Sequence, residues 1–246
     1  MLKRRLSEYF KFLKSLMRTN RLLLWGMWKL TKLPQPAITV FGGSRVPLEG
    51  KAAQDARKIG YMLAREGFSI ITGGGPGIME SANMGAIEYV SENLKFCKLN
   101  GEERCKPLFI SAGINLIKLN KERTNPYVQD NIITGHFFAR KWLLVRYSVG
   151  FVVFPGGFGT MDELFEIITL IQCNRMSKVP IVLMHKDYWA PLELWIRTRA
   201  LENNLINPED INIISITDSV EEAVNIITAR SRTHAESVLQ DETTKR

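Results

Sequence analysis

The segment Phe154 to Glu166, "FPGGFGTMDELFE", combines residue types that bind anions with residue types that transfer protons. Its chemistry-bearing positions are Gly156, Gly157, Gly159, Thr160 and Glu163. Glycine lets the backbone approach a ligand closely, and the free N–H groups at a helix N-terminus attract phosphate. A carboxylate one helical turn further on would then stand beside the bound anion, where it could act as a general acid or base. A second interpretation is open, in which Thr160 caps the helix and Glu163 only completes a capping box.

Two other glycine clusters accompany this segment. "FGGSR" contains Ser44 and Arg45, and "TGGGPGIME" contains Gly73, Gly74, Gly75, Met79 and Glu80. Each cluster follows a hydrophobic run and precedes a helical pattern, so all three should lie at the carboxyl edge of a parallel sheet, where such folds bind ligands. Neither the dinucleotide fingerprint nor the phosphate-loop NTPase motif is present, which disfavours NAD-linked redox chemistry and NTP hydrolysis.

The elements that position these clusters alternate between strands and helices. Strands are expected at 37–42, 68–72, 107–113, 150–154, 179–184 and 211–216. Helices are expected at 51–66, 77–93, 136–148, 160–173, 188–203 and 218–230. The pattern predicts an α/β fold over residues 37–230, a Rossmann-like doubly wound parallel sheet with helices on both faces. Residues 94–106 are expected to form a polar surface excursion, and residues 231–246 a disordered polar tail.

The N-terminal segment, residues 1–36, holds all of the net charge. It contains nine basic residues and one acidic residue, which equals the +8 of the whole chain, so the rest is neutral overall. We therefore expect no nucleic acid as a partner. Residues 2–30 predict a basic amphipathic helix that ends before Pro34. Three interpretations are open: packing on the body or on a second subunit, contact with an anionic membrane surface, and a targeting segment.

The cysteines indicate a reducing compartment. Cys97, Cys105 and Cys173 form no CxxC pair and show no metal-type spacing with histidine. A Cys97–Cys105 disulfide is a minor alternative. No apolar run approaches the roughly 20 residues of a membrane-spanning helix. We expect a cytoplasmic protein, peripheral at a membrane if the N-terminal helix binds lipid, with no metal and no cofactor.

A basic pair, Arg140 and Lys141, stands near the start of the expected helix 136–148 and by itself would be solvated surface. Together, "GGGPGIME", this "RK" pair and "PGGFGTMDELFE" resemble the LOG (lonely guy) family, often labelled lysine decarboxylase-like, over residues 37–230. The resemblance implies a homodimeric, metal-free phosphoribohydrolase. Such an enzyme hydrolyses the N-glycosidic bond of a nucleoside 5′-monophosphate, such as AMP or a cytokinin riboside monophosphate, to the free base and ribose 5-phosphate.

The resemblance also implies roles for individual residues. Arg140 and Glu163 would form the catalytic pair. The substrate-binding residues would be Gly156, Gly157, Gly159, Thr160, Gly73, Gly74, Gly75, Met79, Glu80, Ser44, Arg45 and Lys141. Lysine decarboxylation is disfavoured because the motifs supply no Schiff-base lysine for pyridoxal phosphate. The alternative from another class is a catalytically silent nucleotide-binding or sensor module, recruited through its N-terminal helix.

Overall fold

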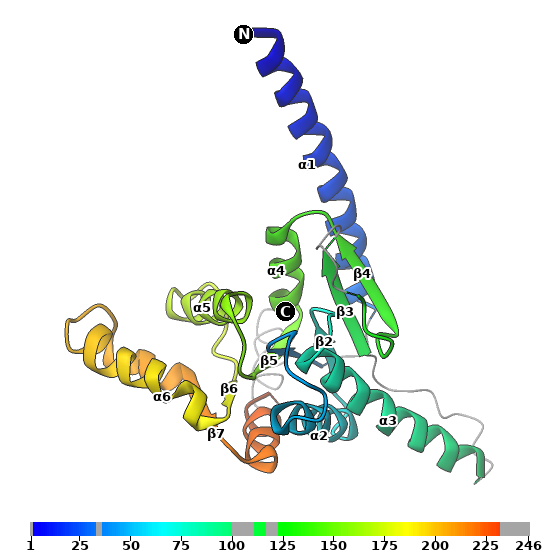
Figure 1. Cartoon of the computed structure of the whole chain (residues 1–246), viewed down its shortest axis with the longest axis vertical. Helices are drawn as coiled ribbons and strands as arrows, with labels where there is room; N and C mark the ends of the chain where they lie inside the picture. The colour runs from blue at the N-terminus through cyan, green and yellow to red at the C-terminus, as the bar shows by residue number, and fades with distance from the viewer. Residues whose placement is uncertain (1, 33–35, 100–110, 117–122, 232–246) are drawn as a thin grey trace, which may run out of the picture.

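The sheet is parallel throughout and lies at the centre of the molecule (Figure 1). The computed structural model describes residues 2–32, 36–99, 111–116 and 123–231. Its seven strands run in the order β4-β3-β2-β1-β5-β6-β7. They are β1 (Ala37–Phe41), β2 (Ser69–Thr72), β3 (Ser111–Leu116), β4 (Asp130–Thr134), β5 (Ser148–Val153), β6 (Ile181–Met184) and β7 (Ile214–Thr217). The predicted Rossmann-like doubly wound sheet is confirmed.

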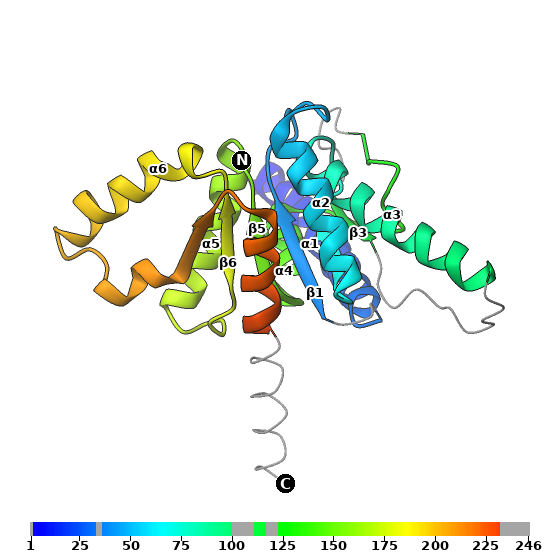
Figure 2. The ribbon, with the colours of Figure 1, turned by 90° about the horizontal axis from the view of Figure 1, so that it is seen from below.

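Helices cover both faces of this sheet. They are α1 (Leu2–Leu30), α2 (Lys51–Arg65), α3 (Ile78–Leu99), α4 (Phe137–Arg146), α5 (Phe158–Gln172), α6 (Lys186–Trp195) and a helix over residues 220–231. Side chains that alternate along the strands pack into two hydrophobic cores, one on each face of the sheet. In β1, Ile38 and Val40 pack in the core with α2, α3 and residues 220–231, whereas Phe41 packs in the core with α4 and α5. Figure 2 shows α2 and the helix of residues 220–231 on one side of the sheet. Burial on both faces explains why the strands are hydrophobic throughout.

The topological switch point lies between β1 and β5. The chain adds β2, β3 and β4 on one side of β1, then returns to place β5 on the other side. The loops that follow β1 and β5 are therefore neighbours, and the Gly43 N–H donates to the Pro155 carbonyl at 3.0 Å. Crevices of this kind are where open α/β sheets bind ligands.

Several expected boundaries were wrong. The strand expected at 107–113 is β3, Ser111–Leu116, and residues 107–110 lie outside the described residues. The excursion expected at 94–106 is helical to Leu99, where α3 ends, and its remainder also lies outside the described residues. β4 was missed because it begins with Asp130 and Asn131, which disfavour strands. Its pairing with β3 outweighs that preference.

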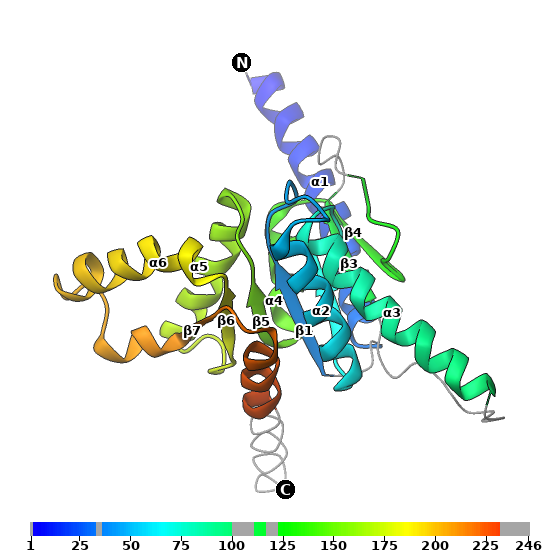
Figure 3. The same ribbon diagram turned by 60° about the horizontal axis from the view of Figure 1, so that its bottom comes forward.

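The C-terminal third differs from expectation in helix type. The helix expected at 188–203 is α6, which contains Pro191, followed by a π-helical stretch, η1 (Ile196–Leu201). Figure 3 shows α6 reaching away from the sheet. The strand expected at 211–216 starts later, because a 3₁₀ helix, η2 (Pro208–Ile213), precedes β7. Of the tail expected at 231–246, all but the first residue lies outside the described residues.

The predicted N-terminal helix is present as α1, and only its C-terminal half packs on the body. Leu30 is fully buried, and a Cβ on Gly26 would lie 2.8 Å from the Leu143 side chain of α4. The N-terminal half projects beyond the sheet (Figure 1). Within the described parts of the chain, no helix combines the length and the apolar character needed to cross a membrane.

Candidate active site

A cavity of about 490 Å³ opens at the switch point. It is lined by Gly42, Gly43, Ser44, Arg45, Met79, Arg140, Gly157, Phe158, Gly159, Thr160 and Glu163. These residues come from the loops after β1 and β5, from the start of α3, and from α4 and α5. The structure thus brings all three glycine clusters and the predicted catalytic pair to one place.

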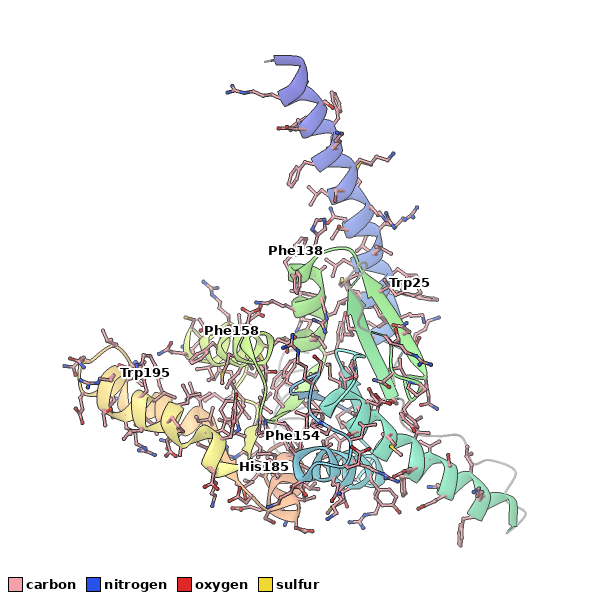
Figure 4. The ribbon with its side chains drawn as sticks, in the orientation of Figure 1. Trp25, Phe138, Phe154, Phe158, His185 and Trp195 are labelled. Atoms are coloured by element: carbon pink, nitrogen blue, oxygen red, sulfur yellow. The ribbon has the colours of Figure 1, made fainter. Side chains whose placement is uncertain are left out.

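The first turn of α5 forms one wall of this cavity. The helix begins at Phe158 with Gly157 at its N-cap position, and no side chain caps it. The capping-box interpretation is therefore wrong, because Thr160 lies inside the helix. A Cβ added to Gly157 or Gly159 would meet no protein atom within 4 Å, and Phe158 between them is 96% exposed (Figure 4). The turn therefore presents free backbone N–H groups to open space, as an anion site requires.

The second glycine loop is buried and held by polar side chains. Asn125 donates its backbone N–H to the Gly74 carbonyl and its side-chain amide to the Gly75 carbonyl, both at 2.9 Å. The Thr72 hydroxyl donates a hydrogen bond to Oδ1 of Asn83 at 2.7 Å and accepts one from the Gly74 N–H at 3.0 Å. A satisfied buried network of this kind fixes a loop in one conformation.

Arg140 is held between this loop and the cavity. Its Nε donates to the Ile114 carbonyl at 2.9 Å and its Nη2 to the Gly73 carbonyl at 3.3 Å. The third nitrogen, Nη1, lies 3.9 Å from Oε1 of Glu163. A Cβ on Gly73 would come within 2.3 Å of Nη2, so the glycine is required for the guanidinium to take this place.

Glu163 projects from α5 toward Arg140, and its side chain is 15% exposed. Burial raises the pKa of its carboxyl to about 7, although the nearby Arg140 charge acts to lower it. Glu163 therefore changes its protonation state near neutral pH. That property suits a group that exchanges protons with water or stabilises a cationic intermediate.

Lys141, the second member of the basic pair, does not line the cavity. Its Nζ lies 2.7 Å from Asp162 and 3.5 Å from Glu166 on α5. Burial would lower the pKa of Lys141, but the hydrogen bond to Asp162 and the charge of Glu166 outweigh it, and the pKa is raised. Lys141 therefore joins α4 to α5 and stays charged.

Other predicted residues lie behind the cavity wall. Gly73, Gly74 and Gly75 are buried beneath it, and Glu80 is half-buried on α3 outside its lining. Gly156 leaves no room for a side chain, because a Cβ there would lie 2.2 Å from Oγ1 of Thr160. These residues shape the site from within the protein.

Sequence reasoning missed three residues that support the loops. Asn83 and Asn125 hold the second glycine loop, and the Tyr188 hydroxyl donates to the Gly156 carbonyl from α6. Isolated asparagines and a tyrosine far along the chain carry no local signal. A polar residue on the buried face of a helix, as Asn83 is, was the one available hint.

The comparisons with known proteins agree with this geometry. A family model described as "Possible lysine decarboxylase" matches residues 79–227, and a second, described as "SLOG cluster4 family", matches residues 35–91. A pyrimidine/purine nucleotide 5′-monophosphate nucleosidase of Escherichia coli is 30% identical over 148 residues, which cover 57% of this chain and 30% of that protein. The chain therefore spans about a third of the length of that relative.

Two further relatives cover more of the chain. A cytokinin riboside 5′-monophosphate phosphoribohydrolase of Arabidopsis thaliana is 26% identical over 187 residues, which are 76% of this chain and 80% of the plant protein. The solved structure of a molybdenum cofactor binding protein from Rippkaea orientalis shares the fold, with a TM-score of 0.52 and 23% identity over 79% of this chain and 96% of that one. The family match covers more than half of the chain and includes both Arg140 and Glu163, so this protein belongs to the lysine decarboxylase-like, LOG-type family.

Proposed function

We propose that this protein is a phosphoribohydrolase that cleaves the N-glycosidic bond of a nucleoside 5′-monophosphate. The observation that carries the proposal is the position of Glu163, a shielded carboxylate 3.9 Å from Arg140, on the same helix and in the same cavity as an open anion site. The names of the bacterial and plant relatives support the same substrate class. We further propose that it acts in the cytoplasm.

The 5′-phosphate would bind at the first turn of α5. Gly157 and Gly159 leave the approach free, and the helix dipole places partial positive charge there. Glu163 follows Gly159 by four residues, which is one turn and about 6 Å along the helix axis. A ribose held by its phosphate at the N-terminus would therefore extend alongside Glu163.

Glu163 would act on the sugar. In the reaction, the bond from C1′ to the base breaks, the base leaves with the electron pair, and the oxygen of water bonds to C1′. The Glu163 carboxylate stabilises the developing charge on C1′ and accepts one proton from the attacking water. That proton is then passed to the departing base, which regenerates the carboxylate, and Arg140 keeps part of the Glu163 population ionised.

The direct test is hydrolysis of a nucleotide panel. Purified protein is incubated with AMP, other nucleoside 5′-monophosphates and the matching nucleosides, and free base and ribose 5-phosphate are measured. We expect monophosphates to be cleaved and nucleosides not. Glu163→Gln and Arg140→Ala should each reduce kcat/KM by about 100-fold or more. Lys58→Gln, an exposed lysine of α2 that does not line the cavity, is the matched control.

Two results would contradict the assignment. Full activity in Glu163→Gln would remove the carboxylate from the chemistry. Tight binding of AMP with no release of base from any monophosphate would favour the alternative, a nucleotide-binding or sensor module without catalysis. Calorimetric titration with AMP distinguishes that outcome from a protein that binds no nucleotide.

Assembly as a homodimer is part of the proposal. A cavity of about 790 Å³ between α5, α6, η1 and η2 has Trp195 and Leu205 in its lining, and both are exposed. Large exposed apolar side chains around a hollow suit a contact with a second copy. Sedimentation equilibrium should give twice the mass of the chain, and Trp195→Asp should reduce it to the monomer mass. A membrane surface is the second partner that we propose, through residues 1–36.

A further inference from the structure

The projecting helix α1 has two opposite faces, and only one is covered. Thr19, Gly26 and Leu30 are buried against the body. Met17, Leu24 and Trp28 each precede one of these by two residues, which is about 200° around the helix. They consequently point away from the body, and all three are exposed.

The outward residues form an apolar stripe that only one turn, at Asn20 and Arg21, interrupts. It consists of Leu6, Phe10, Leu13, Met17, Leu24 and Trp28, all exposed and mostly at three- and four-residue steps. Such spacing places side chains on one line along a helix. The stripe runs from Leu6 to Trp28, about 33 Å at roughly 1.5 Å per residue. Exposed apolar surface of this extent marks an interaction site.

Cations border the stripe at regular positions. Lys14, Arg21 and Lys32 each follow a stripe residue by four positions. The Lys32 ammonium lies 3.4 Å from the centroid of the Trp28 ring, which confirms that this border is adjacent. Lys11 and Arg18 add exposed positive charge on the same flank. The body carries no net charge, so the basic character of the protein is concentrated on this helix.

Two copies of α1 pairing through the stripe would bring like charges together. Residues 1–36 offer nine basic side chains and a single acidic one, Glu8, so few ion pairs could form between copies. Like charges beside a helix seam are destabilising. A surface of negative phospholipid headgroups is complementary to this pattern, since apolar and aromatic side chains enter the boundary layer and basic ones remain at the headgroups.

We propose that α1 attaches this protein to an anionic phospholipid surface. The helix lies in the plane of the membrane with its stripe inserted below the headgroups, while its opposite face holds the body through Thr19, Gly26 and Leu30. Lipid attachment is independent of nucleotide hydrolysis, because none of the stripe residues lines the cavity at the switch point.

Co-sedimentation of the full chain with vesicles tests this proposal. We expect binding to vesicles of phosphatidylcholine with 30% phosphatidylserine at 0.1 M salt, and little binding to pure phosphatidylcholine. Raising the salt to 0.5 M should weaken binding strongly, because screening shortens the range of surface charge. Replacing Lys11, Lys14, Arg18 and Arg21 by Gln should lower the partition coefficient more than about 100-fold, at about fivefold for each charge.

The stripe is tested by Phe10→Gln, Met17→Gln and Leu24→Gln together, which should abolish binding to both kinds of vesicle. Deletion of residues 2–14 should weaken binding while the docked half of α1 stays in place, since that half holds the Ser15–His136 hydrogen bond and the buried Thr19 and Leu30. The matched control combines Lys58→Gln, Lys178→Gln and Phe96→Gln, exposed positions outside α1, and should bind as the unaltered chain does.

Three results would overturn the proposal. The first is that the full chain stays in the supernatant with anionic vesicles. The second is that it binds both vesicle types equally, and the third is that binding is unchanged after the stripe residues are replaced by Gln. The stripe would instead be assigned to contact with a second copy if two results came together. These are that the unaltered chain binds no vesicles, and that the stripe variant has a smaller mass than the unaltered chain in sedimentation equilibrium. Circular dichroism of each variant confirms that α1 is still helical, and AMP hydrolysis is scored separately.

Discussion

Two glycine loops at the same sheet edge differ in what their glycines allow. At Gly73 the missing side chain is required by the protein itself, because a Cβ would lie 2.3 Å from Arg140. At Gly159 a Cβ would meet no protein atom within 4 Å. The first glycine makes room for the Arg140 side chain, and the second leaves the cavity side of the α5 N-terminus open.

This difference separates a buried, structural loop from an open loop that we propose to bind phosphate. The loop at residues 73–75 is buried and tied by Asn125, and Gly74 has a φ of +73° that a side chain would strain. The loop at 157–159 faces the cavity and has ordinary backbone angles at Gly157. Substitutions in the first should damage the protein, and substitutions in the second should damage only the binding of phosphate.

The largest effect is expected from Gly73→Ala. The new methyl group would displace the Arg140 guanidinium and the Met79 sulfur, which lies 2.8 Å from the same position. A shift of about 1 Å in a positioning group costs about 100-fold in rate. We expect kcat/KM for AMP to fall by about that factor and the melting temperature to fall as well. An alanine variant with unaltered kinetics would contradict the assigned role of Arg140.

Gly159→Ala is the matched substitution in the open loop. We expect the dissociation constant for AMP to rise about 10- to 100-fold, because the methyl group occupies the approach to the free N–H groups. The free energy of unfolding should stay equal or rise by up to about 1 kcal/mol, because alanine is the better helix former. Calorimetric titration and urea unfolding check the two parts. A loss of stability with unchanged AMP affinity would contradict the prediction, because it would give the 157–159 loop a structural role and no role in binding.

Glu163→Gln should stabilise the folded protein at high pH. The folded-state pKa of about 7 exceeds the usual value, so between about pH 4.5 and pH 7 the folded chain binds more protons than the unfolded chain. Stability therefore falls as the pH rises through this window. The substitution should raise the free energy of unfolding by about 1 to 3 kcal/mol at pH 8 and by little at pH 4.5. Urea unfolding at pH 8 and at pH 4.5 measures this gain in the free energy of unfolding. An equal gain at both pH values would contradict the raised pKa of Glu163.

Tyr188→Phe should have the smallest effect. It removes the hydroxyl that donates to the Gly156 carbonyl, and so loosens the phosphate loop from behind. A neutral hydrogen bond contributes about 1 kcal/mol, so KM for AMP should rise about threefold to tenfold with kcat little changed. Steady-state kinetics test this. Tyr147→Phe, a tyrosine outside the cavity, serves as the control, and an equal change in both variants would remove Tyr188 from the site.

Local patterns predicted most of the fold. The strand–glycine–helix order gave the doubly wound sheet and the common edge of the three loops, because periodicity and glycine are local properties of the chain. β4 was not predicted, because its edge position depends on pairing with β3. The π-helical stretch η1 after α6 was not predicted either, because no local pattern in the sequence indicated the helix type there. Glu163 was singled out by its position one turn after the glycine loop, with a capping role as the alternative. Arg140 was identified only through the family resemblance, because a basic pair on a helix is by itself ordinary solvated surface.

The sequence by itself determined the architecture, the edge that carries the site and the basic, amphipathic character of the N-terminal helix. Only the tertiary structure showed that Thr160 does not cap α5 and that Lys141 forms ion pairs with Asp162 and Glu166. It alone also showed that a side chain at Gly73 would collide with Arg140, whereas one at Gly159 would meet no neighbour. It also decided which face of α1 is covered and which is exposed. The physical reason is that burial, contact and the pKa of a carboxyl depend on neighbours far away in the chain, whereas periodicity and charge are properties of the chain itself.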